Sequence, residues 1–254
     1  NCVAHHIGGS GFYAIDQFTD ISFINCDTYA NADPYSSDAY GGADGFALNS
    51  SAAAGNILLR GCRAWYNSDD GIDLYAVQGL VTVDRCWTWR NGYEYNTTNH
   101  TGDGNGIKLG ITADYSGTLK RIVTNCITFG NFNTGILQNM AQCIIHLYNN
   151  TSYGNNGHGI EIYSYSLVHV IKNNVSFGNT GNNYNDDGGT AIANAIISNN
   201  SYDADWQPTG PVATAADFES LSTVVLDQKR NTDGSLPKLR SFRLRAGSDL
   251  IDAG

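Results

Sequence analysis

A short phrase, Asn-Cys-x-(Ser/Thr/Ala)-aromatic-x-Asn, recurs along the chain at a nearly constant step. Its second position falls at residues 2, 26, 62, 86, 126, 150, 174 and 200, so the steps are 24, 36, 24, 40, 24, 24 and 26. A period of about 24 residues without a helical pattern is typical of coils stacked into a solenoid. The two long steps indicate loops inserted into single coils, and such insertions often gather on the binding face.

The repeat places equivalent residues of successive coils next to one another, in columns. Cysteines at one position form a ladder roughly 4.8 Å apart per coil, and we expect them to be free, buried hydrophobic residues rather than disulfides or metal ligands: Cys2, Cys26, Cys62, Cys86 and Cys126. An asparagine column is expected to form amide hydrogen bonds from coil to coil: residues 31, 67, 91, 131, 155 and 179. An aromatic column is expected to be a stack of core rings: residues 29, 65, 89, 129, 153 and 177.

Composition excludes some classes of partner. The formal net charge of −10 disfavours nucleic acid. The same charge makes an acidic polymer an awkward ligand unless a metal ion or a local basic patch reverses the field. The apolar runs, such as Leu80–Val83 and Ile144–Leu147, fall far short of the ~20 residues of a membrane span. We therefore expect no nucleic-acid partner and no membrane insertion, and the sequence leaves the oligomeric state open.

We expect one all-β domain with a tail. Residues 1–207 carry the repeat, while residues 208–254 break it and hold six of the 14 Lys and Arg residues. Residue 1 lies inside a repeat with no signal-peptide pattern before it, so we expect the first coils to lie outside this chain. The tail is expected to form a short helix over Ala213–Leu221, fold back along the solenoid and cover its last coil.

A second phrase, a glycine followed by an apolar residue, opens another strand in each coil. Because side chains alternate along a strand, the residue two after the glycine points outward, which gives a column of Tyr13, Ala47, Asp73, Lys108, Leu137 and Glu161. The residue just before the glycine gives a column of Ser10, Asp44, Asp70, Asn105, Thr134 and His158. Four carboxylates thus converge on adjacent coils: Asp44, Asp69, Asp70 and Asp73.

The converging carboxylates predict a cation site. Unpaired, they would repel one another and raise one another's pKa values. Hard oxygen ligands in this number suit Ca²⁺ better than Mg²⁺ or zinc. A solvated acidic edge, in which each Asp caps a turn, explains one or two of these residues but not four.

Lys108 lies next to this cluster in the outward column. A bound divalent cation would lower its pKa and make it a general base. The stacking argument leaves this role and a plain ion pair with Asp73 equally open. The inserted segment Asn91–Gly104 could form one side of a sugar-binding groove, or it could be a longer turn without a binding role.

At these residues the sequence resembles the family-nine polysaccharide lyases. The resemblance rests on Ser68-Asp-Asp-Gly-Ile-Asp-Leu74, on Trp87-x-Trp-Arg-Asn-Gly-Tyr93, on Gly102-Asp-Gly-Asn-Gly-Ile-Lys-Leu-Gly110 and on the C-terminal segment from Arg243. It implies a right-handed parallel β-helix, a calcium-dependent pectate lyase, Ca²⁺ on Asp44, Asp69, Asp70 and Asp73, and Lys108 as the base. One departure is that Leu137-Gln-Asn-Met140 stands where the family usually has a polar Asp-Gln-Asn stretch.

The resulting hypothesis is a secreted enzyme that cleaves polygalacturonate by β-elimination. Bound Ca²⁺ would bridge the acidic protein and the acidic polymer. Candidate substrate contacts are Asn105, Arg63, Arg90 and Tyr93. Three alternatives remain: hydrolysis with Asp69 and Asp70 as the acid and base, a lyase for alginate or a glycosaminoglycan, and a non-catalytic calcium-stabilised β-helix that binds glycans.

Overall fold

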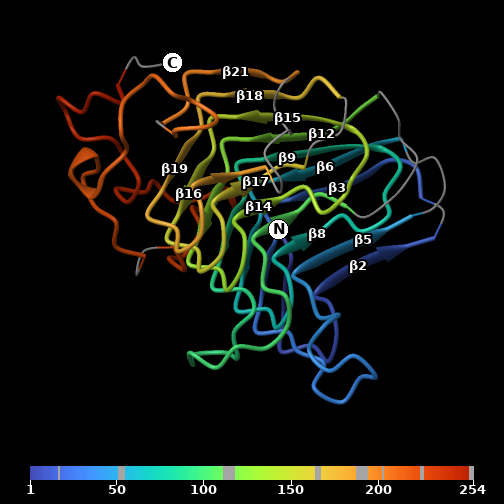
Figure 1. Cartoon of the computed structure of the whole chain (residues 1–254). Helices are drawn as coiled ribbons and strands as arrows, with labels where there is room; N and C mark the ends of the chain where they lie inside the picture. The colour runs from blue at the N-terminus through green and yellow to red at the C-terminus, as the bar shows by residue number, and fades with distance from the viewer. Residues whose placement is uncertain are drawn as a thin grey trace.

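In the computed structural model the chain winds into stacked coils, as the repeat predicts (Figure 1). The structure describes residues 1–16, 18–50, 55–110, 118–163, 167–186, 194–201, 203–223 and 226–251. Three seven-stranded sheets, here called A, B and C, run along the stack. The one helix in the described ranges is a single 3₁₀ turn, so none of their elements is a helix that could cross a membrane.

Sheet A contains the first repeated phrase. It orders its strands by coil as β1 (Val3–His5), β4 (Asp27–Tyr29), β7 (Arg63–Trp65), β10 (Trp87–Trp89), β13 (Ile127–Phe129), β16 (Thr151–Tyr153) and β19 (Val175–Phe177). All its pairs are parallel and in register, so that Asp27 lies beside Arg63 and Tyr29 beside Trp65. The columns predicted from the repeat are therefore real neighbours in space.

Sheet B contains the second repeated phrase. Its strands are β2 (Phe12–Ile15), β5 (Phe46–Asn49), β8 (Ile72–Asp73), β11 (Ile107–Lys108), β14 (Ile136–Leu137), β17 (Ile160–Glu161) and β20 (Tyr184–Asn185). The register pairs Ala47 with Asp73, Asp73 with Lys108, and Lys108 with Leu137. This is the outward column that the glycine alignment predicts.

Sheet C closes each coil. Its strands are β3 (Ile21–Ile24), β6 (Asn56–Arg60), β9 (Leu80–Asp84), β12 (Leu119–Thr124), β15 (Ile144–Tyr148), β18 (Val170–Lys172) and β21 (Ile196–Ser198). The register slips once, between Leu119 and Arg121 of β12. With these strands the chain is a parallel β-helix whose interior is filled by stacked Ile, Leu, Val and Phe side chains.

The predicted ladders are present. Cys26, Cys62, Cys86 and Cys126 are buried and free, whereas Cys2 is exposed. Amide side chains continue that column: Asn150 donates to Asn174 at 2.9 Å and Asn174 to Asn200 at 3.0 Å. The other asparagine column is bonded from coil to coil over its whole length: residues 31, 67, 91, 131, 155 and 179. These bonds fix the register at two of the corners of the coil.

The aromatic column differs from the expectation because it lies outside the β-helix. Tyr29 stacks on Trp65 with ring centroids 4.4 Å apart, and Trp65 stacks on Trp89 at 4.7 Å. The neighbouring residue Thr28 is fully buried, as alternation along the strand requires if the rings point outward. From Trp65 onward the rings of this column join a second apolar cluster that the C-terminal tail completes with Phe218 and other residues.

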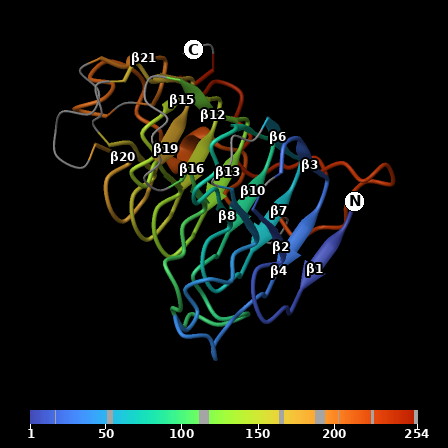
Figure 2. The ribbon, with the colours of Figure 1, turned by 90° about the vertical axis from the view of Figure 1, so that its right-hand side faces the viewer.

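The tail runs back along sheet A (Figure 2). Only Ala215–Asp217 form a helical turn, η1, which is shorter than the expected helix over Ala213–Leu221. Phe218 stacks on Phe177 at 4.8 Å, and farther along Arg230 reaches Asp27 near the other end of the stack. The last coil is covered by Trp206, which packs on Tyr184 and joins the interior cluster.

Candidate active site

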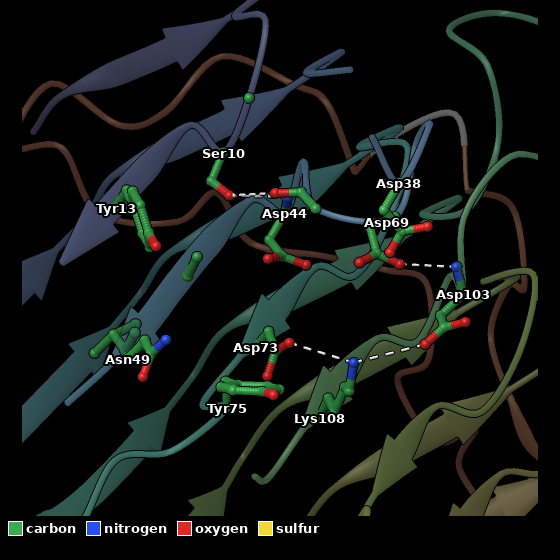
Figure 3. Close-up of a pocket in the computed structure, with 15 residues that line it drawn as sticks. Ser10, Tyr13, Asp38, Asp44, Asn49, Asp69, Asp73, Tyr75, Asp103 and Lys108 are labelled. Atoms are coloured by element: carbon green, nitrogen blue, oxygen red, sulfur yellow. Dashed lines mark hydrogen bonds and ion pairs between the residues drawn. The ribbon is translucent and has the colours of Figure 1, made fainter. Parts of the chain in front are cut away.

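Asp73 and Lys108 lie side by side on the outer face of sheet B, and Asp44 and Asp69 lie beside them on the turns that precede β5 and β8 (Figure 3). The Lys108 Nζ atom lies 2.9 Å from Asp70 Oδ2 and 3.3 Å from Asp73 Oδ2. Carboxylate oxygens of Asp44, Asp70 and Asp73 all lie within 4.8 Å of one another. The site therefore spans three consecutive coils.

Backbone hydrogen bonds between coils position these carboxylates. Asp44 Oδ1 accepts the N–H of Asp70 at 3.1 Å, and Asp70 Oδ1 accepts the N–H of Asn105 at 2.6 Å. The glycine that follows is required, because a Cβ on Gly71 would lie 2.6 Å from the Gly106 carbonyl oxygen. Each of these two aspartates uses one oxygen to hold the next coil, which leaves the second oxygen for the site.

A groove of about 530 Å³ opens over the cluster. Two of its lining residues, Asp38 and Asp103, are not among the residues that the sequence pattern singles out. Asp103 lies 3.6 Å from Lys108 Nζ, and its N–H donates to Asp69 Oδ1 at 2.7 Å. Its position between Gly102 and Gly104, close to Asn105, is a sequence signal that could have identified Asp103 as a residue of the groove. Asp38 lies on the loop inserted before β5, where the repeat step of 36 marks an insertion.

The crowded carboxylates have raised pKa values. Burial is the main cause, and the neighbouring charges of Asp73 and Asp70 add to it at Asp44, whose pKa rises well above its usual range. Burial and then Asp70 raise the pKa of Asp69 to about 8. Burial raises the pKa of Asp73 to about 6, although Lys108 opposes it. The protein alone thus holds more carboxylates here than one ammonium group can balance.

Lys108 itself is held as an ammonium ion. Burial lowers its pKa, but the charges of Asp70 and Asp73 outweigh burial and raise the pKa above its ordinary value. The ion pair with Asp73, one of the two interpretations left open by the sequence, is therefore present. A lysine in this state cannot accept a proton, so base chemistry at Lys108 requires the carboxylates to be engaged elsewhere.

The residues present fit a divalent cation. The donors are carboxylate oxygens, which hard cations prefer, and the side chains of Asp44, Asp69, Asp70 and Asp73 are all buried. Asp73 Oδ1 is buried and has no hydrogen-bond partner among the described residues. A buried carboxylate oxygen without a partner is costly, and a cation would satisfy it.

Comparison with known proteins identifies the fold family. The model of the Pel9A-like right-handed β-helix region matches residues 1–164. The chain belongs to this family. Its β-helix is therefore right-handed, in agreement with the resemblance seen in the sequence.

Relatives of this Pel9A-like chain carry lyase names. It is 36% identical to pectate lyase L of Dickeya dadantii over its whole length, which is 56% of that relative. It is 31% identical to pectate lyase PEL9 of Emericella nidulans, covering 96% of this chain and 60% of that one. The chain thus spans a little over half the length of the curated relatives that it matches.

Two solved structures share the fold. A crystal structure of pectate lyase Pel9A superposes with a TM-score of 0.77 at 33% identity, covering 97% of this chain and 57% of that one. A rhamnogalacturonan lyase superposes with a TM-score of 0.70 at 26% identity, covering 98% of this chain and 63% of that one.

Two predicted substrate contacts of the Pel9A-like chain, Arg63 and Asn105, are bonded to other parts of the protein. Arg63 points from the outer face of sheet A and is buried, with its guanidinium bonded to Asp27 at 2.6 and 2.8 Å and to the Leu226 carbonyl at 2.9 Å. Asn105 is also buried, and its amide donates to Asp70 Oδ1 at 2.9 Å. Both side chains thus have hydrogen-bond partners within the protein, and their role as substrate contacts stays a prediction.

Arg90 and Tyr93 lie away from the groove. Arg90 follows β10 in a left-handed backbone conformation, with φ of 56°, and does not line the cavity. Tyr93 lines a separate cavity of about 120 Å³ and pairs with His100 across its loop. The inserted segment Asn91–Gly104 reaches the groove through Asp103 rather than through its aromatic residues.

Proposed function

We propose that the protein is a pectate lyase that cleaves polygalacturonate by β-elimination, with Ca²⁺ as cofactor and Lys108 as the base. The observation that carries this proposal is the Lys108 amine, which lies in an open groove 2.9 Å from one buried carboxylate and 3.3 Å from another. The pectate lyases among its relatives support the choice of substrate. The polymer is too large to enter a cell, so we also propose that the protein acts outside the cell.

Asp44, Asp69, Asp70 and Asp73 would hold the cation. Carboxylate oxygens of Asp44, Asp70 and Asp73 lie together, Asp69 forms an adjoining group with Asp70 and Asp103, and Asp73 Oδ1 has no hydrogen-bond partner among the described residues. Bound Ca²⁺ supplies positive charge that holds the sugar carboxylate and stabilises negative charge developing next to it. With a cation on Asp70 and Asp73, these carboxylates would no longer hold Lys108 as an ammonium ion. The pKa of Lys108 then falls toward the range in which its neutral amine exists.

The chemical step follows from the position of that amine. Lys108 Nζ takes the proton from C5 of the uronate. The electron pair of the C5–H bond becomes the second bond between C4 and C5, and the C4–O bond breaks with its electron pair on oxygen. A proton from solvent neutralises the leaving oxygen. One product carries a 4,5-unsaturated end, the other is a shortened chain, and no water is consumed.

The charge of the groove explains why a cation is needed for binding as well as for chemistry. Asp38, Asp44 and Asp103 line the groove together with two further aspartates and a single lysine. A polyuronate would be repelled by this field unless cations reverse it. Binding of the polymer should therefore depend on Ca²⁺ even in a variant that cannot turn it over.

The test is the ultraviolet absorbance of the unsaturated product during action on polygalacturonate, with Ca²⁺ and with a chelator. We expect a calcium-dependent rise, and we expect Lys108→Ala to lower its rate by about 10²–10⁴-fold while calorimetry still detects Ca²⁺ binding. Lys229→Ala is the matched control, because Lys229 is exposed on the tail, and it should leave the rate unchanged.

Other outcomes separate the rival functions. Product from rhamnogalacturonan or alginate but not from polygalacturonate would contradict the proposed substrate and keep the reaction. Calcium-dependent binding of the polymer without any product, in the chain and in Lys108→Ala alike, would contradict the enzyme and favour a glycan-binding β-helix.

A further inference from the structure

The groove is asymmetric about Lys108. Its sheet B lining comes from the strand of Lys108 and from the coils before it, and includes Tyr13, Ala47, Asp73 and Tyr75. On the other side of Lys108 the outward column continues with Leu137, which is only 8% exposed and does not line the groove. The room for a bound polymer therefore extends from Lys108 toward β2.

Two tyrosines of this groove are exposed without an aromatic partner. Tyr13 is 63% exposed and Tyr75 is 44% exposed. Elsewhere in the molecule aromatic side chains stack in ladders, as Tyr29 does on Trp65, but neither Tyr13 nor Tyr75 contacts another ring among the described residues. Each leaves an apolar ring surface facing the space that a ligand would occupy (Figure 3).

The spacing of the column matches a chain of sugars. The register places Ala47 between Tyr13 and Asp73, so Tyr13 is two strands, or about 10 Å, from Asp73. Ala47 has a small side chain and leaves a hollow between the ring and the carboxylate. The repeat of a 1,4-linked pyranose chain is close to the spacing of one coil. Tyr75 lies two residues after Asp73, beside the reacting centre, while Tyr13 lies farther along (Figure 3).

We propose that Tyr75 and Tyr13 are sugar-stacking residues that hold hexuronate units of the polymer, Tyr75 near the reacting unit and Tyr13 about two units away. Pyranose rings present C–H groups on their faces, and aromatic rings pack against them without any need for charge. This attraction is valuable in a groove whose carboxylates repel a polyuronate. The inference rests on the proposed function, because it names the residues that position the same substrate.

The experiment is isothermal titration calorimetry with galacturonate oligosaccharides in saturating Ca²⁺, on a Lys108→Ala background that prevents turnover. Tyr75→Ala should weaken binding of both the disaccharide and the pentasaccharide. Tyr13→Ala should weaken the pentasaccharide about tenfold, equivalent to about 1.4 kcal/mol, and leave the disaccharide within about twofold. Tyr13→Phe and Tyr75→Phe keep the ring and should restore most of the affinity.

Tyr35→Ala is the matched control, since Tyr35 is 99% exposed on the loop before β5 and does not line the groove. In the active chain, Tyr13→Ala should raise KM for long substrates and leave kcat nearly unchanged. The inference is overturned if both alanine variants, with unchanged thermal unfolding, bind the pentasaccharide as tightly as Tyr35→Ala does. If the parent binds no galacturonate oligosaccharide at all, the proposed function fails and the inference fails with it.

Discussion

The outer faces of sheets A and B are built from the same repeat, yet their buried carboxylates are in opposite electrostatic states. On sheet A, Asp27 accepts from Arg63 at 2.6 Å and from Arg230 at 2.6 Å. Burial alone would raise the pKa of Asp27, but these two guanidinium groups outweigh it and lower the pKa. On sheet B, Asp44 and Asp73 have raised pKa values because they are buried and several carboxylates share one lysine.

The difference teaches how to distinguish a structural carboxylate from a binding one. Asp27 has all the positive charge it needs from the protein, and the tail that carries Arg230 covers it. The cluster on sheet B is short of positive charge and opens into a groove. A completed ion pair stabilises the fold, whereas an uncompensated cluster predicts a cation that comes from solution.

The largest expected effect is on sheet A. Asp27→Ala leaves the buried Arg63 guanidinium and the partly buried Arg230 guanidinium without their carboxylate, so we expect the free energy of unfolding to fall by about 3–5 kcal/mol. Chemical denaturation measures this change. Calcium affinity at sheet B should stay within about twofold, and a large loss there would show that the two faces are coupled.

Asp73→Asn tests whether a carboxylate on sheet B binds a cation rather than stabilising the fold. Removing one charge from a repelling cluster should leave the cation-free protein as stable as before or more stable, while Ca²⁺ affinity falls by about 10²-fold, or about 2.7 kcal/mol. Calorimetry gives the affinity and thermal unfolding in chelator gives the stability. A strongly destabilised cation-free variant would contradict the comparison, because it would make Asp73 a structural residue like Asp27.

The pH dependence of stability should have opposite signs on the two faces. The pKa values of Asp73, about 6, and Asp69, about 8, are raised above the value in the unfolded chain. The contribution of these two residues to the free energy of unfolding is therefore fully present at low pH and is lost as pH rises through these pKa values. In chelator the melting temperature should fall by several degrees between about pH 5 and pH 8, at roughly 2–4 °C per kcal/mol. Added Ca²⁺ should remove this fall.

Asp27 supplies the contrast in the same titration. Its pKa is lowered, so its contribution is present above the unfolded value, near pH 4, and is lost as pH falls. The Asp27→Ala variant should lose the acid limb of the profile and keep the alkaline one. A profile in chelator that stays flat above neutral pH would contradict the raised pKa values on sheet B.

The smallest effect concerns Asn105. Its amide supports Asp70 from the next coil, in the way that outer-shell partners orient metal ligands, so Asn105→Ala should weaken Ca²⁺ binding by about tenfold. Substrate affinity at saturating Ca²⁺ should change little. A rise in KM at saturating Ca²⁺ would instead support the prediction that Asn105 contacts substrate.

The sequence predicts the positions of those residues that belong to the repeat. Asp73 and Lys108 occupy one column, so counting residues from the glycines is enough to place them side by side. The same counting does not place Arg63, because its neighbour Arg230 and the carbonyl of Leu226 arrive from a tail outside the repeat. Asp38 lies on an inserted loop that the repeat does not describe.

Sequence also fails to distinguish a residue that contacts ligand from one that supports it. Asn105 stands in the right column for a substrate contact, but its short amide is used by Asp70 on one side and by the Thr134 N–H on the other. The spacing of the aromatic column suggests an interior stack, although alternation along the strand puts its rings on the outside. Both cases concern the direction of a side chain or its hydrogen-bond partners, which spacing alone does not encode.

The hydrogen bonds that run along the site column have a consequence for engineering. Ser10 Oγ accepts the N–H of Asp44, which in turn supports Asp70, which supports Asn105. Along this column each coil is aligned by its immediate neighbours, so the segment that holds the predicted cation ligands and Lys108 should behave as an exchangeable cassette, although its contacts with the tail through Arg63 would be lost. Transplanted between the coils of another solenoid with the same strand register, this segment would bring its own alignment with it.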